Sequence, residues 1–138
     1  MSDQFWEARF SVVISGNELP FEQLNGDLGL KATRVIRTGD MLNKLPEVYA
    51  GRDEWLYTVQ LTDPNGEDKD MNQVLMQLIE HREALSVIQQ MYTVTLRLYI
   101  RSNKAMIAYR LMPETLQHLL AIGIPLDVTS LSWGDVGM

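Results

Sequence analysis

The stretch TVTLRLYIR, residues 93–101, gives the clearest indication of a β-strand in this chain of 138 residues. Apolar and polar side chains alternate along it, which is typical of a strand that buries one face. The apolar positions are Val94, Leu96, Leu98 and Ile100. The opposite positions are Thr95, Arg97, Tyr99 and Arg101. The stretch therefore predicts a sheet with a core on one side and arginines on the other.

The residues after this strand predict its hairpin partner. SNKA, residues 102–105, is suited to a loop, and MIAYRLM, residues 106–112, would return as a strand. This arrangement would place Arg110 near the polar face of the first strand. If helices cover the apolar face, the open face would be lined by Arg97, Tyr99, Arg101 and Arg110.

This group of side chains has two interpretations. Arginine guanidinium groups and a tyrosine form a surface suited to anions or carboxylates, so the open face would bind a ligand or a partner. The simpler interpretation is an ordinary solvated sheet face, whose charges pair with acids on neighbouring strands.

Other parts of the chain predict further strands. Phe10–Ile14 and Trp55–Leu61 alternate in the same way. ATRVIRTGDML, residues 32–42, reads as a strand or an extended arm, and residues 43–53 read as a loop. LDVTSLSW, residues 126–133, predicts a last strand. One face of that strand would carry Thr129, Leu131 and Trp133.

Three helices follow from apolar residues at spacings of three and four. The first spans about residues 19–29, and the second and longest spans about residues 71–91. The third begins at Pro113 and ends at Gly123, since proline suits a first turn and glycine suits a helix end. Its buried stripe would consist of Leu116, Leu119 and Leu120.

The resulting order of elements is β-α-β-β-α-β-β-α-β. This order predicts an α+β fold, in which a mostly antiparallel sheet has its helices packed on one face. The first six elements follow the ferredoxin-like β-α-β-β-α-β plan, and a further β-α-β extends it. We expect a single domain over residues 1–138, because a chain of this length builds one core of its own.

Charge and composition limit the possible partners. The net charge of −6 repels nucleic-acid phosphates and anionic membranes, so we expect neither as a partner and favour a basic protein. The absence of cysteine excludes disulfides and thiolate metal sites and fits a reducing compartment. The stretch MSDQFWEARF does not resemble a signal peptide, and no apolar run is long enough to span a membrane. A cytoplasmic location is therefore expected.

The glycines do not form a recognisable phosphate-binding loop. Gly26, Gly29 and Gly39 do not have the spacing of a dinucleotide-binding motif, and no Gly-Lys-Ser/Thr follows for a P-loop. We interpret them as turn and helix-end residues.

No metal or catalytic motif is recognised either. His81 and His118 fall on different predicted helices without metal-ligand spacing. The acidic stretch DPNGEDKD, residues 63–70, lacks the sixth-position glycine and twelfth-position glutamate of a calcium-binding EF-hand loop, so we interpret it as a turn with a helix cap. The sequence predicts no catalytic residues, no metal site and no cofactor.

The order of several turn residues resembles a bacterial family known as a domain of unknown function, forty-two seventy-nine (DUF4279). Its members commonly show an LGL-x-P-T step, a Gly-Asp turn, a strand that begins with Trp, and a late helix followed by glycine and an aliphatic strand. The counterparts here are Leu28, Gly29 and Leu30, then Thr33, then Gly39 and Asp40, then Trp55, and finally Gly123 before Leu126–Trp133. Ala32 stands where proline is usual. The resemblance covers roughly residues 8–133 and implies a small α+β protein without an assigned activity or catalytic residues.

Size, charge and the missing motifs favour a non-catalytic protein-binding domain. An immunity or antitoxin protein, whose acidic face covers the basic active site of a toxin, fits this description. An exposed edge strand could also pair two copies as a homodimer. Two alternatives stay open: a small-ligand sensor or regulatory domain with a pocket between sheet and helices, and an enzyme built from scattered carboxylates or His118.

Overall fold

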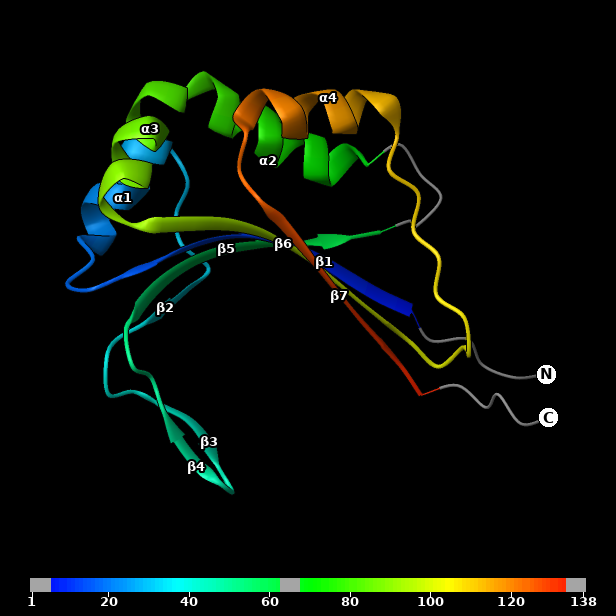
Figure 1. The fold of residues 1–138 in the computed structure, drawn as a ribbon, viewed down its shortest axis with the longest axis horizontal. Helices are drawn as coiled ribbons and strands as arrows, with labels where there is room; N and C mark the ends of the chain where they lie inside the picture. The colour runs from blue at the N-terminus through cyan, green and yellow to red at the C-terminus, as the bar shows by residue number, and fades with distance from the viewer. Residues whose placement is uncertain (1–5, 63–67, 134–138) are drawn as a thin grey trace.

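The computed structural model describes residues 6–62 and 68–133, so most of the acidic stretch at 63–70 lies outside the described residues. Helices are interspersed among the strands along the chain (Figure 1). The elements are β1 (Trp6–Gly16), α1 (Phe21–Leu28), β2 (Arg34–Ile36), β3 (Met41–Lys44), β4 (Glu47–Tyr49), β5 (Asp53–Leu61), α2 (Lys69–Glu80), α3 (Arg82–Met91), β6 (Thr93–Ser102), α4 (Pro113–Ile122) and β7 (Leu126–Ser132).

The main sheet has five strands in the order β2-β5-β1-β6-β7 within the described part of the chain. All neighbouring strands are antiparallel except β6 and β7, which are parallel because α4 crosses back between them. The helices lie together on one face of this sheet (Figure 1). The predicted α+β class with a mostly antiparallel sheet is therefore confirmed.

The core lies between the sheet and the helices. β1 contributes Phe10, Val12 and Ile14, which are buried as the sequence predicts, and Val13 between them is buried as well. The helix α2 contributes Met71, Leu75 and Leu78. Each such side chain stabilises the fold by roughly 1.5–3 kcal/mol when it is fully buried. The core therefore fixes which face of every strand remains outside.

The prediction that residues 106–112 form a strand paired with β6 is wrong. Residues 106–112 form no strand, and the neighbours of β6 are β1 and β7. The segment is instead held to the beginning of α2: the Tyr109 hydroxyl donates to Asp68 Oδ1 at 2.9 Å, and the Met112 N–H donates to Asp68 Oδ2 at 3.2 Å. Arg110 lies between these two anchors and is not placed on a strand beside β6.

The predicted long helix over 71–91 is divided in two at His81, whose φ of −110° and ψ of 26° are not helical. Each half buries a different surface: α2 packs on β5 and α4, and α3 packs on β6 and α1. The apolar spacing continues through the break, and for this reason the sequence pattern does not reveal it.

The predicted buried stripe of the third helix is also largely wrong. Leu116 and Leu120 are 50% and 83% exposed, and only Leu119 of the three is partly buried against the core. The helix α4 packs on α2, and its fully buried residue is Thr115. A polar contact at the beginning of the helix sets its rotation, and this contact has no apolar signature.

Two smaller differences concern turns. The predicted loop at 43–53 contains most of a two-stranded hairpin, β3–β4, which is separate from the main sheet. The first helix is shorter than predicted, but its end at Gly29 is confirmed. Gly29 has a φ of +64°, and a Cβ there would lie 2.6 Å from Gln77 Nε2. Glycine is thus required at this position both by its conformation and by close packing.

Candidate functional site: the open face of the sheet

The face of the main sheet opposite the helices carries polar side chains from neighbouring strands, and we call it the open face. In the register of the sheet, Arg9 lies opposite Tyr99 and Glu7 lies opposite Arg101. β7 continues these rows, because Thr129 is beside Tyr99 and Leu131 is beside Arg101. The residues of the open face used below are Glu7, Arg9, Ser11, Thr58, Arg97, Tyr99, Arg101, Asp127, Thr129, Leu131 and Trp133.

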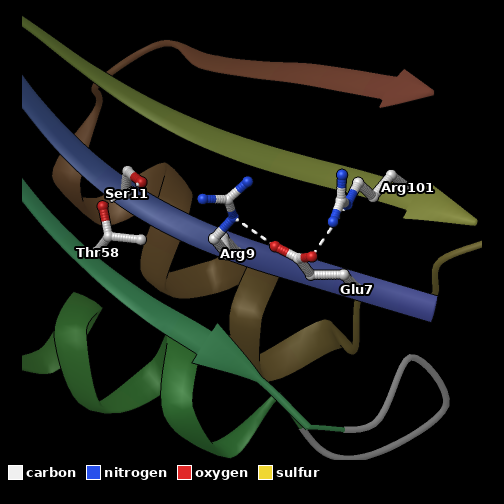
Figure 2. Close-up of polar contacts among 5 residues, drawn as sticks. All are labelled: Glu7, Arg9, Ser11, Thr58 and Arg101. Atoms are coloured by element: carbon white, nitrogen blue, oxygen red, sulfur yellow. Dashed lines mark hydrogen bonds and ion pairs between the residues drawn. The ribbon is translucent and has the colours of Figure 1, made fainter. Parts of the chain in front are cut away.

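Glu7 stands between two arginines near the beginning of β1, the middle strand of the sheet (Figure 2). Its Oε1 lies 2.9 Å from Arg9 Nε, and its Oε2 accepts a hydrogen bond of 2.9 Å from Arg101 Nε. The Arg9 contact is an ion pair without hydrogen-bond alignment. Because the two arginine side chains are 42% and 39% exposed, these pairs contribute only about 0–1 kcal/mol each. Their main effect is to orient the arginines.

Aromatic rings support the same two arginines. The Arg9 guanidinium carbon lies 5.1 Å from the centre of the Tyr99 ring, and that of Arg101 lies 5.9 Å from the centre of the Trp133 ring. Guanidinium groups at such distances are attracted by the ring face. Figure 2 shows the Nη atoms of Arg9 turned away from Glu7, toward β6. The arginines, the carboxylate and the rings therefore form one ordered array.

A second row of the open face is less constrained. Ser11 and Thr58 share a hydrogen bond of 2.8 Å across β1 and β5. Arg97 lies beside Ser11 on one side and Asp127 on the other, and it is exposed. This row adds a cation with greater conformational freedom next to the ordered array.

The structure brings together three of the four residues that the sequence predicts for this surface. Arg97, Tyr99 and Arg101 share the open face, whereas Arg110 does not reach it, because its segment is anchored to Asp68. Glu7, Arg9 and Trp133 also belong to this surface, and the sequence did not predict them there. The first two could have been found, because they alternate with the buried Ala8 and Phe10 in the same way as Arg97 and Tyr99 do on β6.

Comparison with known proteins gives one match. A family model described as a domain of unknown function (DUF4279) matches residues 6–133. The chain belongs to the DUF4279 family. The match covers nearly all of the chain and confirms the resemblance inferred from the glycine and tryptophan pattern. No curated protein and no solved structure matches the chain.

The histidines of the DUF4279 chain lie apart from the open face. His118 Nδ1 is 3.0 Å from Asn72 Oδ1, between α4 and α2, and His81 Nδ1 is 3.0 Å from the carbonyl oxygen of Gln77. Over residues 6–62 and 68–133, no group of three or more histidine and acidic side chains is placed to hold a metal ion. Within the same ranges, no helix is long and apolar enough to cross a membrane. The chemistry that the open face offers is recognition by guanidinium groups, a carboxylate and aromatic rings.

A second polar cluster of the DUF4279 chain surrounds Asp53, at the beginning of β5. Asp53 Oδ1 accepts hydrogen bonds from the Thr38 N–H at 2.7 Å and the Thr38 hydroxyl at 2.9 Å, and Oδ2 accepts one from the Leu19 N–H at 3.0 Å. A hollow of about 570 Å³ is lined by Asn17, Glu18, Phe21, Arg37, Thr38 and Asp53. The carboxylate joins three connections of the fold, so we assign it a structural role.

We expect the stability of the DUF4279 chain to depend on pH through Asp53. The Thr38 N–H, followed by the Thr38 hydroxyl, holds the pKa of this carboxyl below its usual value of 3.8. Because the folded-state pKa is the lower one, the ionised group stabilises the fold above pH 3.8. This stabilisation is lost as the pH falls through the folded-state pKa.

Asp53→Asn is therefore expected to lower stability at about pH 7, and the difference from the parent chain should shrink below pH 3.8. Urea unfolding of both chains over a pH series measures the difference. If the difference in the free energy of unfolding between the two chains stays constant well below pH 3.8, the titration of Asp53 does not cause the pH dependence.

Proposed function

We propose that this DUF4279 chain is a non-catalytic protein-binding domain that docks its partner on the open face. The supporting observation is that Glu7 orients Arg9 and Arg101, which also lie against Tyr99 and Trp133. Side chains that are ordered in advance lose less conformational entropy on binding. Arginine, tyrosine and tryptophan are also the residue types that contribute most binding energy at protein interfaces.

The charges of the open face favour carboxylates on the partner. Arg9, Arg97 and Arg101 outnumber Glu7 and Asp127 on this face, although the chain as a whole carries a net charge of −6. A planar guanidinium group binds a carboxylate through two parallel hydrogen bonds, which adds geometric specificity to the attraction. The partner surface that fits best therefore presents acidic side chains to the arginines.

A second candidate is supported by the helix layer, which is acidic. The described helices carry six acidic residues and two basic ones. The acidic residues are Glu22, Asp27, Asp70, Glu80, Glu83 and Glu114. Such a surface would attract a basic partner, as an immunity or antitoxin protein attracts a basic toxin. In this proposal the partner covers the helices and leaves the open face uncovered.

Charge reversal separates the two candidates. We expect Arg97→Glu combined with Arg101→Glu to weaken partner capture from the native host at least about tenfold, which corresponds to about 1.4 kcal/mol. Glu80→Lys combined with Glu83→Lys on the helix layer is the matched control and should leave capture unchanged. Thermal melts check that both variants are folded.

The opposite result, with capture lost only after reversal of the helix charges, would favour the basic partner. Equal capture by the parent chain and both variants would contradict docking on either surface.

The ligand-sensor alternative stays a prediction. The space between sheet and helices is filled by buried apolar side chains such as Phe10, Trp55 and Leu75, so binding there would require them to move. Thermal-shift screening against metabolites tests this alternative, because a ligand of the native state raises the melting temperature.

We also propose a ferredoxin-like plan for the sheet, a homodimer and a cytoplasmic location. The order β2-β5-β1-β6 supports the ferredoxin-like plan for the first elements, with β7 as an addition. β7 is an edge strand whose residues are exposed except Leu126, which supports pairing of two copies. The absence of cysteine supports a reducing compartment such as the cytoplasm.

A further inference from the structure

The hairpin β3–β4, residues 41–49, extends away from the body of the protein on the side of the sheet opposite the helices, and we call it the arm (Figure 1). We infer that the arm is the second half of the docking surface and supplies apolar contacts to the partner on the open face. This inference rests on the proposed function. The partner segment that fits both halves places apolar side chains beside carboxylates.

The arm concentrates exposed apolar side chains in a short stretch. Leu45 is 90% exposed and Tyr49 is 52% exposed. The exposed apolar residues of the arm are Met41, Leu42, Leu45, Val48 and Tyr49. A contiguous apolar patch on a soluble protein marks an interaction surface, and a two-stranded hairpin is only marginally stable in water without further packing. The arm therefore has the composition of a segment that is covered when it functions.

Hydrogen bonds close the base of the arm, and the Thr38 N–H ties it to Asp53 at the beginning of β5. Gly39 N–H donates to the carbonyl oxygen of Ala50, and Ala50 N–H donates to that of Asp40, both at 2.8 Å. The Asp40 carboxylate accepts a hydrogen bond of 2.7 Å from the Arg37 N–H. Ala50 is buried. These contacts set the direction in which the arm leaves the sheet, so it is oriented before a partner binds.

The arm and the arginines are close enough to contact one partner. The arm leads directly into β5, and only β1 separates β5 from β6, which carries Arg97 and Tyr99. Neighbouring strands lie roughly 4.8 Å apart and residues about 3.3 Å apart along a strand, so Arg97, which pairs with Ser11, lies about 19 Å from Asp53, which pairs with Gly16 at the base of the arm. An ordinary protein interface of roughly 800 Å² on each partner spans this distance. One partner surface can therefore contact the arm and Arg97 together, and an extended partner segment reaches on to Arg9 and Arg101, which lie about seven and nine strand residues from the end of the sheet that carries the arm.

The charges of the open face argue for a different protein rather than a second copy. In a face-to-face pair of two copies, each surface would present the same three arginines, Arg9, Arg97 and Arg101, against only Glu7 and Asp127, so positive charge would meet positive charge. Like charges brought together at an interface cost several kcal/mol. A partner with carboxylates opposite the arginines and apolar groups opposite the arm avoids this repulsion.

Peptide selection tests the chemistry of the partner directly. A phage-displayed library of random peptides of about 12 residues is selected against the whole chain. We expect enriched peptides that combine Asp or Glu with large apolar residues. Enrichment of basic peptides, of acidic peptides without apolar residues, or of no peptide at all would overturn the inference.

Variants then locate the binding of the most enriched peptide by fluorescence polarisation. Leu45→Ser combined with Val48→Thr should weaken it about tenfold or more. Leu120→Ser on α4 is the matched control, because Leu120 is 83% exposed, and it should change the affinity less than about twofold. Thermal melts of all variants should agree with that of the parent chain.

This experiment tests the role of the arm in binding separately from that of the open face. If Arg97→Glu with Arg101→Glu abolishes binding and the arm variant does not weaken it, the role of the arm is wrong and the proposed function stands. If neither variant weakens binding, both are contradicted.

Discussion

Trp55→Ala should lower the free energy of unfolding by about 3–5 kcal/mol, as expected for the loss of a large buried aromatic side chain. Trp55 is fully buried on β5, between β1 and β2. Its Nε1–H donates to Asn25 Oδ1 at 2.8 Å, and the same oxygen accepts the Ala32 N–H at 3.0 Å. The substitution removes core packing and also one of the two hydrogen bonds that Asn25 Oδ1 accepts. Urea unfolding of both chains measures the change.

Trp55→Phe separates these two contributions. It keeps most of the ring packing but removes the donor to Asn25, so the cost should fall to about 1–3 kcal/mol. Trp133→Ala, at a position that is 51% exposed, is the control and should cost less than about 1 kcal/mol. A cost of less than about 1 kcal/mol for Trp55→Ala would show that Trp55 is not part of a packed core.

Asp68→Gly should destabilise the chain by about 2–4 kcal/mol, because it leaves three buried or half-buried donors without their acceptor. Asp68 is 4% exposed. Its carboxylate accepts hydrogen bonds from the Tyr109 hydroxyl, the Met112 N–H and the Thr115 hydroxyl, at 2.9, 3.2 and 2.9 Å. These contacts fix residues 103–112 and the beginning of α4 to α2. Hydrogen exchange should therefore show faster opening of that region, alongside a lower urea midpoint.

Glycine is chosen to replace Asp68, rather than alanine, so that the substitution adds no backbone strain. Asp68 has a φ of 54°, in the left-handed region that glycine and asparagine tolerate better than alanine. Asp68→Asn keeps the turn and one acceptor oxygen, so its cost should be intermediate. Tyr109→Phe and Thr115→Val each remove one donor, and we expect about 0.5–1.5 kcal/mol from each. If Asp68→Gly lowers the free energy of unfolding no more than Tyr109→Phe or Thr115→Val alone, the three hydrogen bonds do not together hold the segment before α4 to α2.

The sequence predicts the sheet well where alternation alone determines the structure. β6 alternates strictly between buried and more exposed residues, and the predicted apolar positions of β1, Phe10, Val12 and Ile14, are buried, as are Trp55 and Leu61 of β5. Residues 106–112 alternate in a similar way, with Ile107, Tyr109 and Leu111 partly buried, but they form no strand. The contact that decides this is made by Asp68, which is distant in the sequence. Local pattern does not contain that information.

The helices show the same limit. Their existence and approximate positions follow from apolar spacing, but the break at His81 and the rotation of α4 depend on which surface each helix meets. Leu116 and Leu120 look like core residues in sequence and are exposed in the structure. Thr115 looks like a surface residue and is fully buried. The Thr115 hydroxyl donates to Asp68, and this hydrogen bond has no counterpart in the apolar spacing of the helix.

The residues of the open face could be predicted where they follow from the alternation of one strand, but not where they depend on how strands pair. Arg97, Tyr99 and Arg101 follow from the alternation of β6 alone, without knowledge of its neighbours. Arg110 required a pairing that does not form. The array around Glu7 depends on the register of β1 against β6, which no local pattern fixes. Trp133 was predicted on the same face of β7 as Thr129 and Leu131, and only the parallel pairing of β7 brings it to Arg101.

The most direct test of the central claim is site-specific photo-crosslinking in the native host. The photoreactive amino acid benzoylphenylalanine replaces Tyr99 on the open face in one chain and Glu83 on the helix layer in a second. Docking on the open face predicts one discrete adduct from position 99 and none from position 83. An adduct from position 83, with none from position 99, would contradict it.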